Sequence, residues 1–318
     1  ITSGRYEIYN TGHPQEDYFN MYRIDDKSDL KEAVLYVDYK TNIREHNMAA
    51  AGREAGCGFS KSFVESFLCS DGLPISLSNK YLGDETMRKE TANRDPRLKQ
   101  LILTNDFPTN VTDDLKDSTF VVNEDEFITQ HCFTGYRPIK GFNPIYSQAL
   151  YMKSSFDGIA YRYAETLLIN AEAKAELNTI TNADLDRTVN QLRDRVGMPH
   201  LTVNVGFTDP KWPDWGYSLS PVLQEIRRER CIELAGEGFR FNDLKRWKAG
   251  KVLNNVLTYV GKRKPDGNLA IVYPNYTNPD LSYQAGKSRT WEDKMYLYPI
   301  PTGELQRNPQ LLPQNPGW

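Results

Sequence analysis

The sequence predicts a mainly α-helical fold in which helical hairpins support a loop-rich part with short β-strands. Two observations carry this prediction. Apolar residues recur at helical spacing between residues 160 and 247. Glycine, proline, asparagine and aspartate instead interrupt the first 150 residues at short intervals. We therefore expect one unit with three parts, which are a loop-rich part (1–155), helical hairpins (156–250), and a loop excursion with a strand and an extended tail (251–318).

The loop-rich part carries few strong signals for secondary structure. Residues 33–39 form a patch that is either β-like or a short helix. Ser60 stands at an N-cap position before Phe63 and Phe67, which predicts one or two helical turns. The following residues 71–75 (DGLPI) predict a turn that leads into an extended segment.

The helical part begins with a helix expected over about residues 160–177. Its apolar residues share one face because they are spaced at i, i+4, i+7, i+8, i+11 and i+15. They are Ala160, Ala164, Leu167, Leu168, Ala171 and Ala175. A second helix is expected to begin at Asn182 or Asp184 and to pass through Val196. Gly197 and Pro199 end it.

A third helix is expected to begin at Ser220 and Pro221, which suit an N-cap and the first helical position. Gly236 and Gly238 bracket its end, and residues 239–247 form a shorter fourth helix. Two successive hairpins indicate a helical-repeat architecture. Beyond residue 251, residues 262–286 predict loops or a hairpin, residues 295–300 predict one strand, and prolines should keep the tail largely extended.

The third helix carries charges within its apolar face. At about 100° per residue, Arg227 and Arg230 fall in the arc that should face the core, with Glu233 and Glu237 beside them. A buried guanidinium without a partner is too costly to persist, so carboxylates or helix carbonyls should hold both arginines. We interpret these charges and those of the fourth helix as a structural network that clamps two hairpins. Its members are Arg227, Arg230, Glu233, Glu237, Arg240, Asp243 and Arg246.

Catalytic and metal-binding patterns are weak in this sequence. Glutamates at four-residue steps in the third helix resemble a carboxylate ladder, but a bridged di-metal site needs Glu-x-x-His pairs and these helices contain no histidine. The four cysteines show no C-x-x-C spacing, and the four histidines fit no catalytic triad pattern. We therefore expect no metal, no cofactor and no catalytic residue.

Charge and hydropathy argue against two classes of protein. The 318 residues include 39 basic and 42 acidic side chains, so the net charge is −3. Nucleic-acid-binding proteins and proteins held on membranes by charge usually carry a basic face. No apolar run approaches the roughly 18–20 residues that span a bilayer. We expect neither a nucleic-acid partner nor a membrane-spanning helix.

A long motif covers the third and fourth helices. Residues 225–247 (EIRRERCIELAGEGFRFNDLKRW) resemble the signature of the SusD/RagB family. Further stretches fit the family pattern in the expected order. They are residues 71–75 (DGLPI), 93–98 (NRDPRL), 161–165 (YRYAE) with 171–173 (AEA), and 298–301 (YPIP) with 308–309 (NP) and 314–317 (QNPG). None of these motifs is catalytic.

The resemblance implies a function that the residue patterns alone do not show. Members of the family are surface-exposed lipoproteins of the outer membrane of Gram-negative bacteria, with tetratricopeptide-like hairpins beside a loop-rich ligand-binding part. They act with a SusC-like TonB-dependent transporter and deliver oligosaccharides, or in some members peptides, to its pore. The resemblance thus implies a non-enzymatic glycan-binding protein whose ligand is an oligosaccharide or polysaccharide bound by the part at residues 1–155.

The chain departs from the family pattern at its start. It opens at Ile1, without the lipid-bearing cysteine and the N-terminal hairpins of the family. We expect a C-terminal portion of a longer, N-terminally truncated protein, in which apolar helix faces are uncovered or are covered by another chain. Contact with a membrane would come only through the absent lipid anchor.

Aromatic residues in loops are the candidates for ligand binding. Sugar faces stack on flat rings, while amide, carboxylate and guanidinium groups bind the hydroxyls. We predict that the ligand-binding residues are Asn79, Tyr81, Trp212, Asp214, Trp215 and Tyr217. In the structural alternative, the two tryptophans pin their loop to the hairpins or face the transporter.

Three other functions stay open at this stage. A peptide or glycoprotein could be the ligand of the same scaffold. A glycoside hydrolase would need two carboxylates about 5 Å or about 6.5–9.5 Å apart across a cleft. A pure protein-interaction scaffold of helical repeats would bind neither a glycan nor a peptide.

Overall fold

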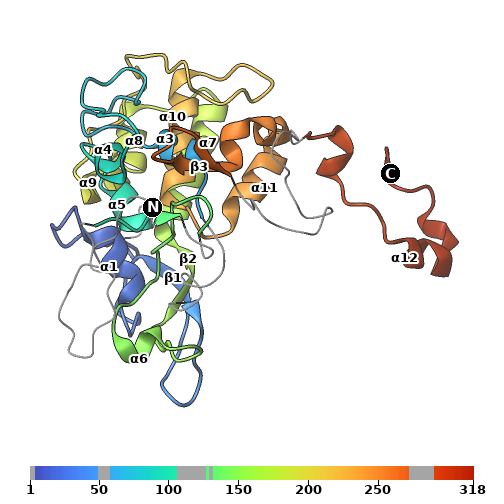
Figure 1. Ribbon diagram of the computed structural model, residues 1–318. Coiled ribbons are helices and arrows are strands. Elements are labelled where there is room, and N and C mark those ends of the chain that lie inside the picture. The colour runs from blue at the N-terminus through green and yellow to red at the C-terminus, as the bar shows by residue number, and fades with distance from the viewer. Residues whose placement is uncertain (1–3, 49–57, 106–126, 129–131, 272–289) are drawn as a thin grey trace.

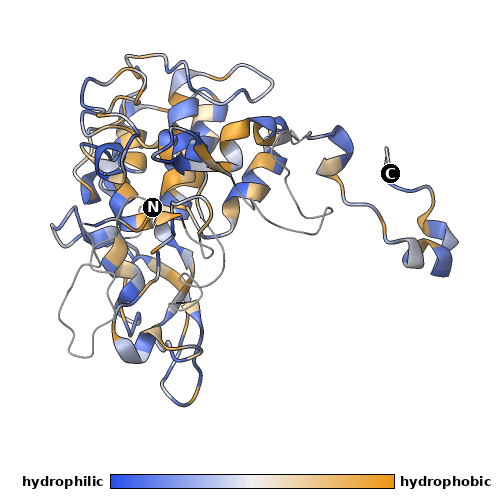
Figure 2. Cartoon of the chain, viewed as in Figure 1, coloured by the Kyte–Doolittle hydropathy of each residue, from blue (hydrophilic) through white to orange (hydrophobic). Residues whose placement is uncertain are grey.

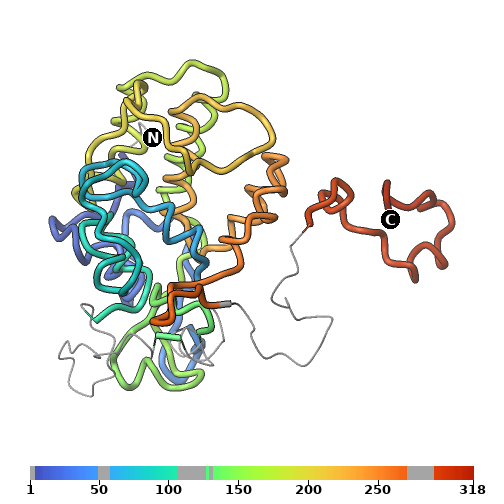
Figure 3. The backbone as a smooth tube through the Cα atoms, turned by 45° about the horizontal axis from the view of Figure 1, so that its top comes forward, coloured from blue at the N-terminus to red at the C-terminus, as the bar shows by residue number. Residues whose placement is uncertain are grey.

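Helices dominate the described part of the chain, as the sequence predicts (Figure 1). The computed structural model describes residues 4–48, 58–105, 127–128, 132–271 and 290–318. The central helices carry both hydrophobic and hydrophilic residues, as helices with one buried face do (Figure 2). The C-terminal residues 302–318 extend from the body as an arm (Figure 3). None of the described helices is long and apolar enough to cross a membrane.

The elements are mostly short. The described α-helices are α1 (Asp17–Arg23), α3 (Lys61–Ser66), α4 (Met87–Thr91), α5 (Arg97–Leu101), α6 (Tyr146–Ala149), α7 (Tyr163–Glu176), α8 (Asn182–Asp186), α9 (Val189–Arg195), α10 (Pro221–Glu233), α11 (Phe239–Arg246) and α12 (Thr302–Arg307). The 3-10 helices are η2 (Gly250–Asn254), η3 (Val256–Thr258), η4 (Asp293–Tyr296) and η5 (Pro309–Leu311). The antiparallel strand pairs are β1 (Ala33–Val37) with β2 (Gly158–Arg162) and β3 (Val260–Arg263) with β4 (Leu269–Ile271).

The helical hairpins share a core built mainly by α7 and α10. On α7, Ala164, Leu167 and Ala171 are fully buried. They belong to the same apolar cluster as Leu223 and Ile226 of α10. The alanines let the helices approach closely, because a small side chain adds little separation between two backbones. A second apolar cluster gathers α1, α3 and α5 in the loop-rich part.

Local signals predicted the starts of several helices correctly. Ser220 caps α10, where its hydroxyl accepts a hydrogen bond from the Leu223 amide, and Pro221 is the first helical residue. Ser60 caps α3 in the same way through the Phe63 amide. The cap hydroxyl and the amide that donates to it lie within three residues of each other, so the sequence alone contains the whole interaction.

Two helices differ from the prediction because contacts at other positions intervene. α7 begins at Tyr163 and not near residue 160, since the preceding residues pair with β1 as a strand. The Tyr163 amide donates to the Glu32 carbonyl at 2.8 Å, which continues this pairing to the start of the helix. The predicted second helix is divided into α8 and α9. At the break, the Thr188 hydroxyl donates to the Asp184 carbonyl at 2.6 Å and so takes the acceptor that a continuous helix would use.

Two predicted extended segments are wrong. Residues 295–300 form no strand, because η4 occupies their start and side chains attach the segment to η2. There the Trp291 amide donates to Asn254, and the Tyr296 hydroxyl accepts from the Gly250 amide at 2.9 Å. After residues 71–75 the chain turns again, since the Leu77 amide returns to a carbonyl at residue 74. The tail is also less extended than predicted, because it contains α12 and η5.

The segment predicted to form loops or a hairpin, residues 262–286, is partly described. β3 and β4 form an antiparallel hairpin over residues 260–271. Residues 272–289, which complete the predicted loop excursion, lie outside the described residues.

A buried charge network joins the loop-rich part to the hairpins. Glu233, the last residue of α10, is 0% exposed, and its carboxylate accepts hydrogen bonds from three arginines. Arg195 Nη2 lies 2.6 Å from both carboxylate oxygens. Arg162 Nη1 lies 2.5 Å from Oε1, and Arg97 Nη1 lies 2.9 Å from Oε2. These arginines come from α9, β2 and α5, so one carboxylate holds three elements that are distant in sequence.

Two more carboxylates complete the network around Arg162. Arg162 Nη1 lies 2.9 Å from Glu32 Oε1, and its Nη2 lies 2.8 Å from Glu237 Oε1. Lys140 Nζ lies 2.6 Å from the same Glu237 oxygen. Each buried charge therefore faces charges of opposite sign, which is the condition for keeping it out of water.

The partners of the α10 charges differ from the predicted clamp. Glu233 and Glu237 bind basic residues from outside the third and fourth helices, because the end of α10 faces α5 and β2. Arg230 instead binds Asp243 of α11, with its Nε 2.9 Å from Oδ2. Arg227 binds a glutamate at the end of α7 with Nη2 at 2.8 Å. Both arginines are buried.

Removing the charge of Glu233 tests how much this network stabilises the fold. The E233Q variant is expected to lower the free energy of unfolding by about 3–5 kcal/mol, because it strips a counter-charge from buried guanidiniums. Urea denaturation followed by circular dichroism measures the change. The matched control is E304Q, whose carboxylate is 52% exposed on α12 and should matter by less than about 0.5 kcal/mol. Equal stability of E233Q and E304Q would contradict the role assigned to Glu233.

Acid should weaken the same network. Burial raises the pKa of Glu233, but Arg195, Arg162 and Arg97 outweigh it and hold this pKa well below its ordinary value of 4.5. Burial likewise raises the pKa of Glu237, while Arg162 and Lys140 lower it to about 2. A carboxylate with a lower pKa in the folded state contributes stability above its unfolded pKa and loses it as pH falls. Urea midpoints should therefore drop between about pH 4.5 and pH 2. A constant midpoint over this range would contradict the prediction.

Candidate ligand-binding site

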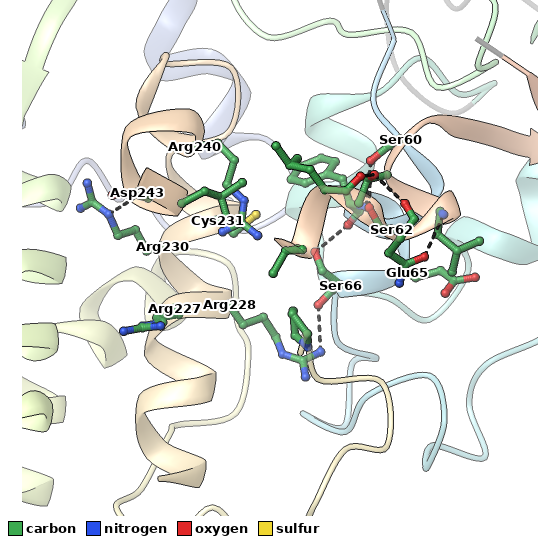
Figure 4. Close-up of a pocket in the computed structure, with 18 of the residues that line it drawn as sticks. Ser60, Ser62, Glu65, Ser66, Arg227, Arg228, Arg230, Cys231, Arg240 and Asp243 are labelled. Atoms are coloured by element: carbon green, nitrogen blue, oxygen red, sulfur yellow. Dashed lines mark hydrogen bonds and ion pairs between the residues drawn. The ribbon is translucent and has the colours of Figure 1, made fainter. Parts of the chain in front are cut away.

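A cavity of about 960 Å³ lies beside α10. Its walls come from α3, the loop at residues 209–215, α10, α11 and the segment that holds η2 and η3. These elements are far apart in the sequence. Figure 4 shows Ser60, Ser62 and Ser66 of the α3 region across the cavity from Arg228 and Cys231 of α10.

The α3 wall offers aromatic rings and hydroxyls side by side. The rings of Phe59 and Phe63 stack with centroids 4.5 Å apart, and both are partly exposed. Ser60 and Ser62 lie 3.0 Å apart through their hydroxyl oxygens. The Ser66 hydroxyl donates to the Phe63 carbonyl at 2.6 Å. A ligand here meets a flat apolar face edged by hydrogen-bonding groups.

The loop at residues 209–215 is attached to α10 by hydrogen bonds from its two indoles. Trp212 Nε1 donates to Glu225 at 2.7 Å, and Trp215 Nε1 donates to Gln224 at 2.6 Å. Trp215 is 4% exposed and packs edge-on against Trp247 at 5.5 Å. Trp212 keeps part of its ring exposed to the cavity. The loop therefore presents one indole to a ligand and buries the other.

The structure separates the predicted binding residues into three locations. Trp212, Asp214 and Trp215 line the cavity beside α3. Tyr217 lines a second cavity of about 880 Å³ between α7 and α11, where its hydroxyl donates to the Trp247 carbonyl at 2.6 Å. Asp214 lies at the surface and accepts a hydrogen bond from an amide of its own loop.

Asn79 and Tyr81 line neither of these two cavities. The Tyr81 ring lies over the Arg94 guanidinium, 5.3 Å from centroid to carbon, and burial raises the pKa of its hydroxyl. Arg94 itself binds three backbone carbonyls, including that of Phe67 at 2.9 Å. Tyr81 thus covers a buried arginine at the edge of α3.

Three carboxylates that line the cavity are each held by a cation. Lys211 Nζ lies 3.0 Å from Glu65. Arg228 Nη2 lies 2.6 Å from Asp209. The third, on α11, is Asp243, which Arg230 holds. Among the described residues, no group of three or more His, Cys, Asp or Glu side chains is arranged to hold a metal ion.

The comparison with sequence families assigns the chain. The sequence model of the SusD family matches residues 9–318. This chain belongs to the SusD family. The motif of residues 225–247 that pointed to this family forms α10 and α11, which carry both the buried charge network and one wall of the cavity.

Individual relatives share the fold over much of this SusD-family chain. The SusD-like protein P2 of Formosa agariphila is 32% identical over 166 residues, which are 52% of this chain and 27% of that protein. A SusD-like protein of Bacteroides fragilis has a solved structure with a TM-score of 0.64 and 24% identity, covering 98% of this chain and 59% of the solved one. A SusD-like carbohydrate binding protein of the same species gives a TM-score of 0.61 and 25% identity, covering 89% and 55%. The chain thus spans little more than half of the solved relatives and about a quarter of P2.

The sequence of this SusD-family chain did not predict the cavity residues that lie opposite the loop at residues 209–215. Phe59, Phe63, Phe241 and Arg240 line the cavity, yet Phe63 was predicted only as part of a short helix and Arg240 only as part of a charge clamp. A half-exposed pair of aromatic residues at i and i+4 beside two serines was a usable signal. Nothing in the sequence placed this pair opposite residues that follow it by about 150 positions.

Proposed function

We propose that this chain binds oligosaccharides without cleaving them, in the cavity beside α10. The observation that carries the proposal is the combination of exposed rings with hydroxyls in one cavity. Trp212 and the stacked pair Phe59 and Phe63 offer flat apolar faces for the C–H faces of sugar rings. Ser60 and Ser62 supply groups that hydrogen-bond to sugar hydroxyls.

The family relationship supports this proposal. One solved relative with 25% identity is described as a SusD-like carbohydrate binding protein. As in the family that the chain resembles, we infer that the complete protein is held at the cell surface by a lipid anchor on the outer membrane. There it would pass its ligand to a SusC-like TonB-dependent transporter. These two steps require partners beyond this chain.

Binding without hydrolysis follows from how the cavity carboxylates are held. Glycoside hydrolysis needs one carboxyl group that donates a proton and a second one that attacks or activates water. Glu65, Asp209 and Asp243 each accept hydrogen bonds from a lysine or an arginine. Three of the four carboxylates that line the cavity therefore already bind a cation, and the fourth, Asp214, is exposed to solvent, so we expect binding without turnover.

A panel of polysaccharides tests the proposed function. We expect retardation in affinity gel electrophoresis by at least one glycan, with no reducing ends released on long incubation. Peptide and glycoprotein probes in the same panel should not bind. Release of sugar products would favour a glycoside hydrolase, and exclusive binding of peptides would favour a peptide carrier. Failure of every probe, together with recovery of a transporter, would favour a protein-interaction scaffold.

Truncation of Trp212 tests the position of the site. The W212A variant should lose about tenfold or more in affinity for the glycan that binds best, because a stacking indole is removed. Isothermal titration measures the loss. W318A is the matched control, since that indole is 47% exposed on the arm, outside the cavity. Retained affinity in W212A combined with loss in Y81A would instead place the ligand at the edge of α3.

A further inference from the structure

One wall of the cavity carries cations that lack acidic partners. Four arginines line this cavity, and three of them are paired with carboxylates. Arg228 binds Asp209, while Arg227 and Arg230 bind acidic residues of α7 and α11. Arg240, on α11, has no carboxylate within ion-pair distance among the described residues. Lys251, at the surface of η2, likewise has none there.

The groups around Arg240 leave one of its N–H donors without a hydrogen-bond acceptor. Its guanidinium carbon lies 5.9 Å from the ring centroids of both Trp215 and Trp247. The rings attract the cation but accept no conventional hydrogen bond in its plane. Arg240 Nη1 is shielded from solvent and has no hydrogen-bond partner. A shielded donor without an acceptor costs free energy, which an incoming acceptor would return.

The Arg240 side chain also lies on the cavity side of α10. Figure 4 shows Arg240 together with Cys231 there, whereas Arg230 is directed toward Asp243, away from the serines of the α3 wall. The carboxylates on the opposite walls cannot neutralise Arg240, because Lys211 and Arg228 already hold Glu65 and Asp209. Asp214 remains at the outer rim, where it is exposed to solvent. The α11 and η2 wall is therefore left with a positive charge beside the aromatic rings.

We propose that Arg240, assisted by Lys251, selects saccharides that carry an acidic group. A carboxylate of a uronic acid or a sulfate ester presents two oxygens that match the fork of a guanidinium. A neutral sugar would stack on the rings but leave the Arg240 donor without an acceptor. Its affinity would therefore be lower than that of an acidic sugar. This inference rests on the proposed function, since it names the class of glycan that the same cavity binds.

Matched pairs of polymers test the charge preference. Polygalacturonate is compared with its methyl ester, and dextran sulfate with dextran, by affinity electrophoresis and titration calorimetry on the 318-residue chain. We expect the acidic member of at least one pair to bind tenfold or more tightly than its neutral partner. The pair that shows the difference identifies whether a carboxylate or a sulfate is recognised.

Substitution of Arg240 tests the residue. R240Q should lose at least tenfold in affinity for the acidic polymer while its affinity for neutral glycans stays within twofold. R240K, which keeps the charge but not the fork, should recover part of the loss. R307Q removes the same charge from the arm, where Arg307 is 79% exposed, and should change neither affinity. K251Q should give a smaller loss on the acidic polymer only.

Several results would overturn the inference. Equal binding of acidic and neutral polymers would do so while leaving the proposed function intact. If R240Q loses affinity for acidic and for neutral glycans to the same extent, Arg240 only supports the neighbouring indoles and does not select for charge. If the thermal melt shows that R240Q does not fold, K251Q decides, and unchanged acidic binding there rejects the inference. Binding of no saccharide at all would reject the proposed function and this inference with it.

Discussion

The fold depends on one buried carboxylate. Glu233 lies at the end of α10 and binds arginines from α5, β2 and α9, all of them shielded from water. A buried charge is stable only while its counter-charges are in place, so these elements must assemble together. The Tyr18 hydroxyl adds α1 to the same centre by donating to the Glu233 carbonyl at 2.6 Å. Charge pairing, and not only apolar burial, therefore sets how the loop-rich part sits on the hairpins.

Different parts of α10 stabilise the fold and line the cavity. The end that carries Glu233 is fully engaged inside the protein. The face that carries Arg228 and Cys231 borders the cavity (Figure 4). Near the start of α10, Gln224 and Glu225 hold the two indoles of the neighbouring loop. A helix anchored so firmly at one end provides a rigid wall, and a rigid wall lowers the entropy cost of ordering a ligand against it.

Features that depend on residues close together in the sequence were predicted correctly, whereas features that depend on distant residues were not. The start of α10 was predictable because Ser220 and the amide that donates to it are three residues apart. The strand expected at residues 295–300 was wrong because the Tyr296 hydroxyl accepts a hydrogen bond from η2 and the nearby Trp291 amide donates one to Asn254, contacts that no local pattern shows. Trp212 and Trp215 were predicted as ligand-binding residues and line the cavity, whereas the sequence did not place the Phe59 wall opposite them. Tyr81 was predicted beside the ligand, but in the structure its ring covers Arg94.

The sequence by itself determined the mainly helical class, the positions of the main helices, the burial of Arg227 and Arg230, and the family, because periodicity, caps and motifs are local properties of the chain. Only the tertiary structure decided which carboxylate each arginine meets and which rings share a cavity. Charge partners such as Arg97 and Glu233 are 136 positions apart. Pairing over that distance depends on how all the elements pack at once, and no spacing rule contains it.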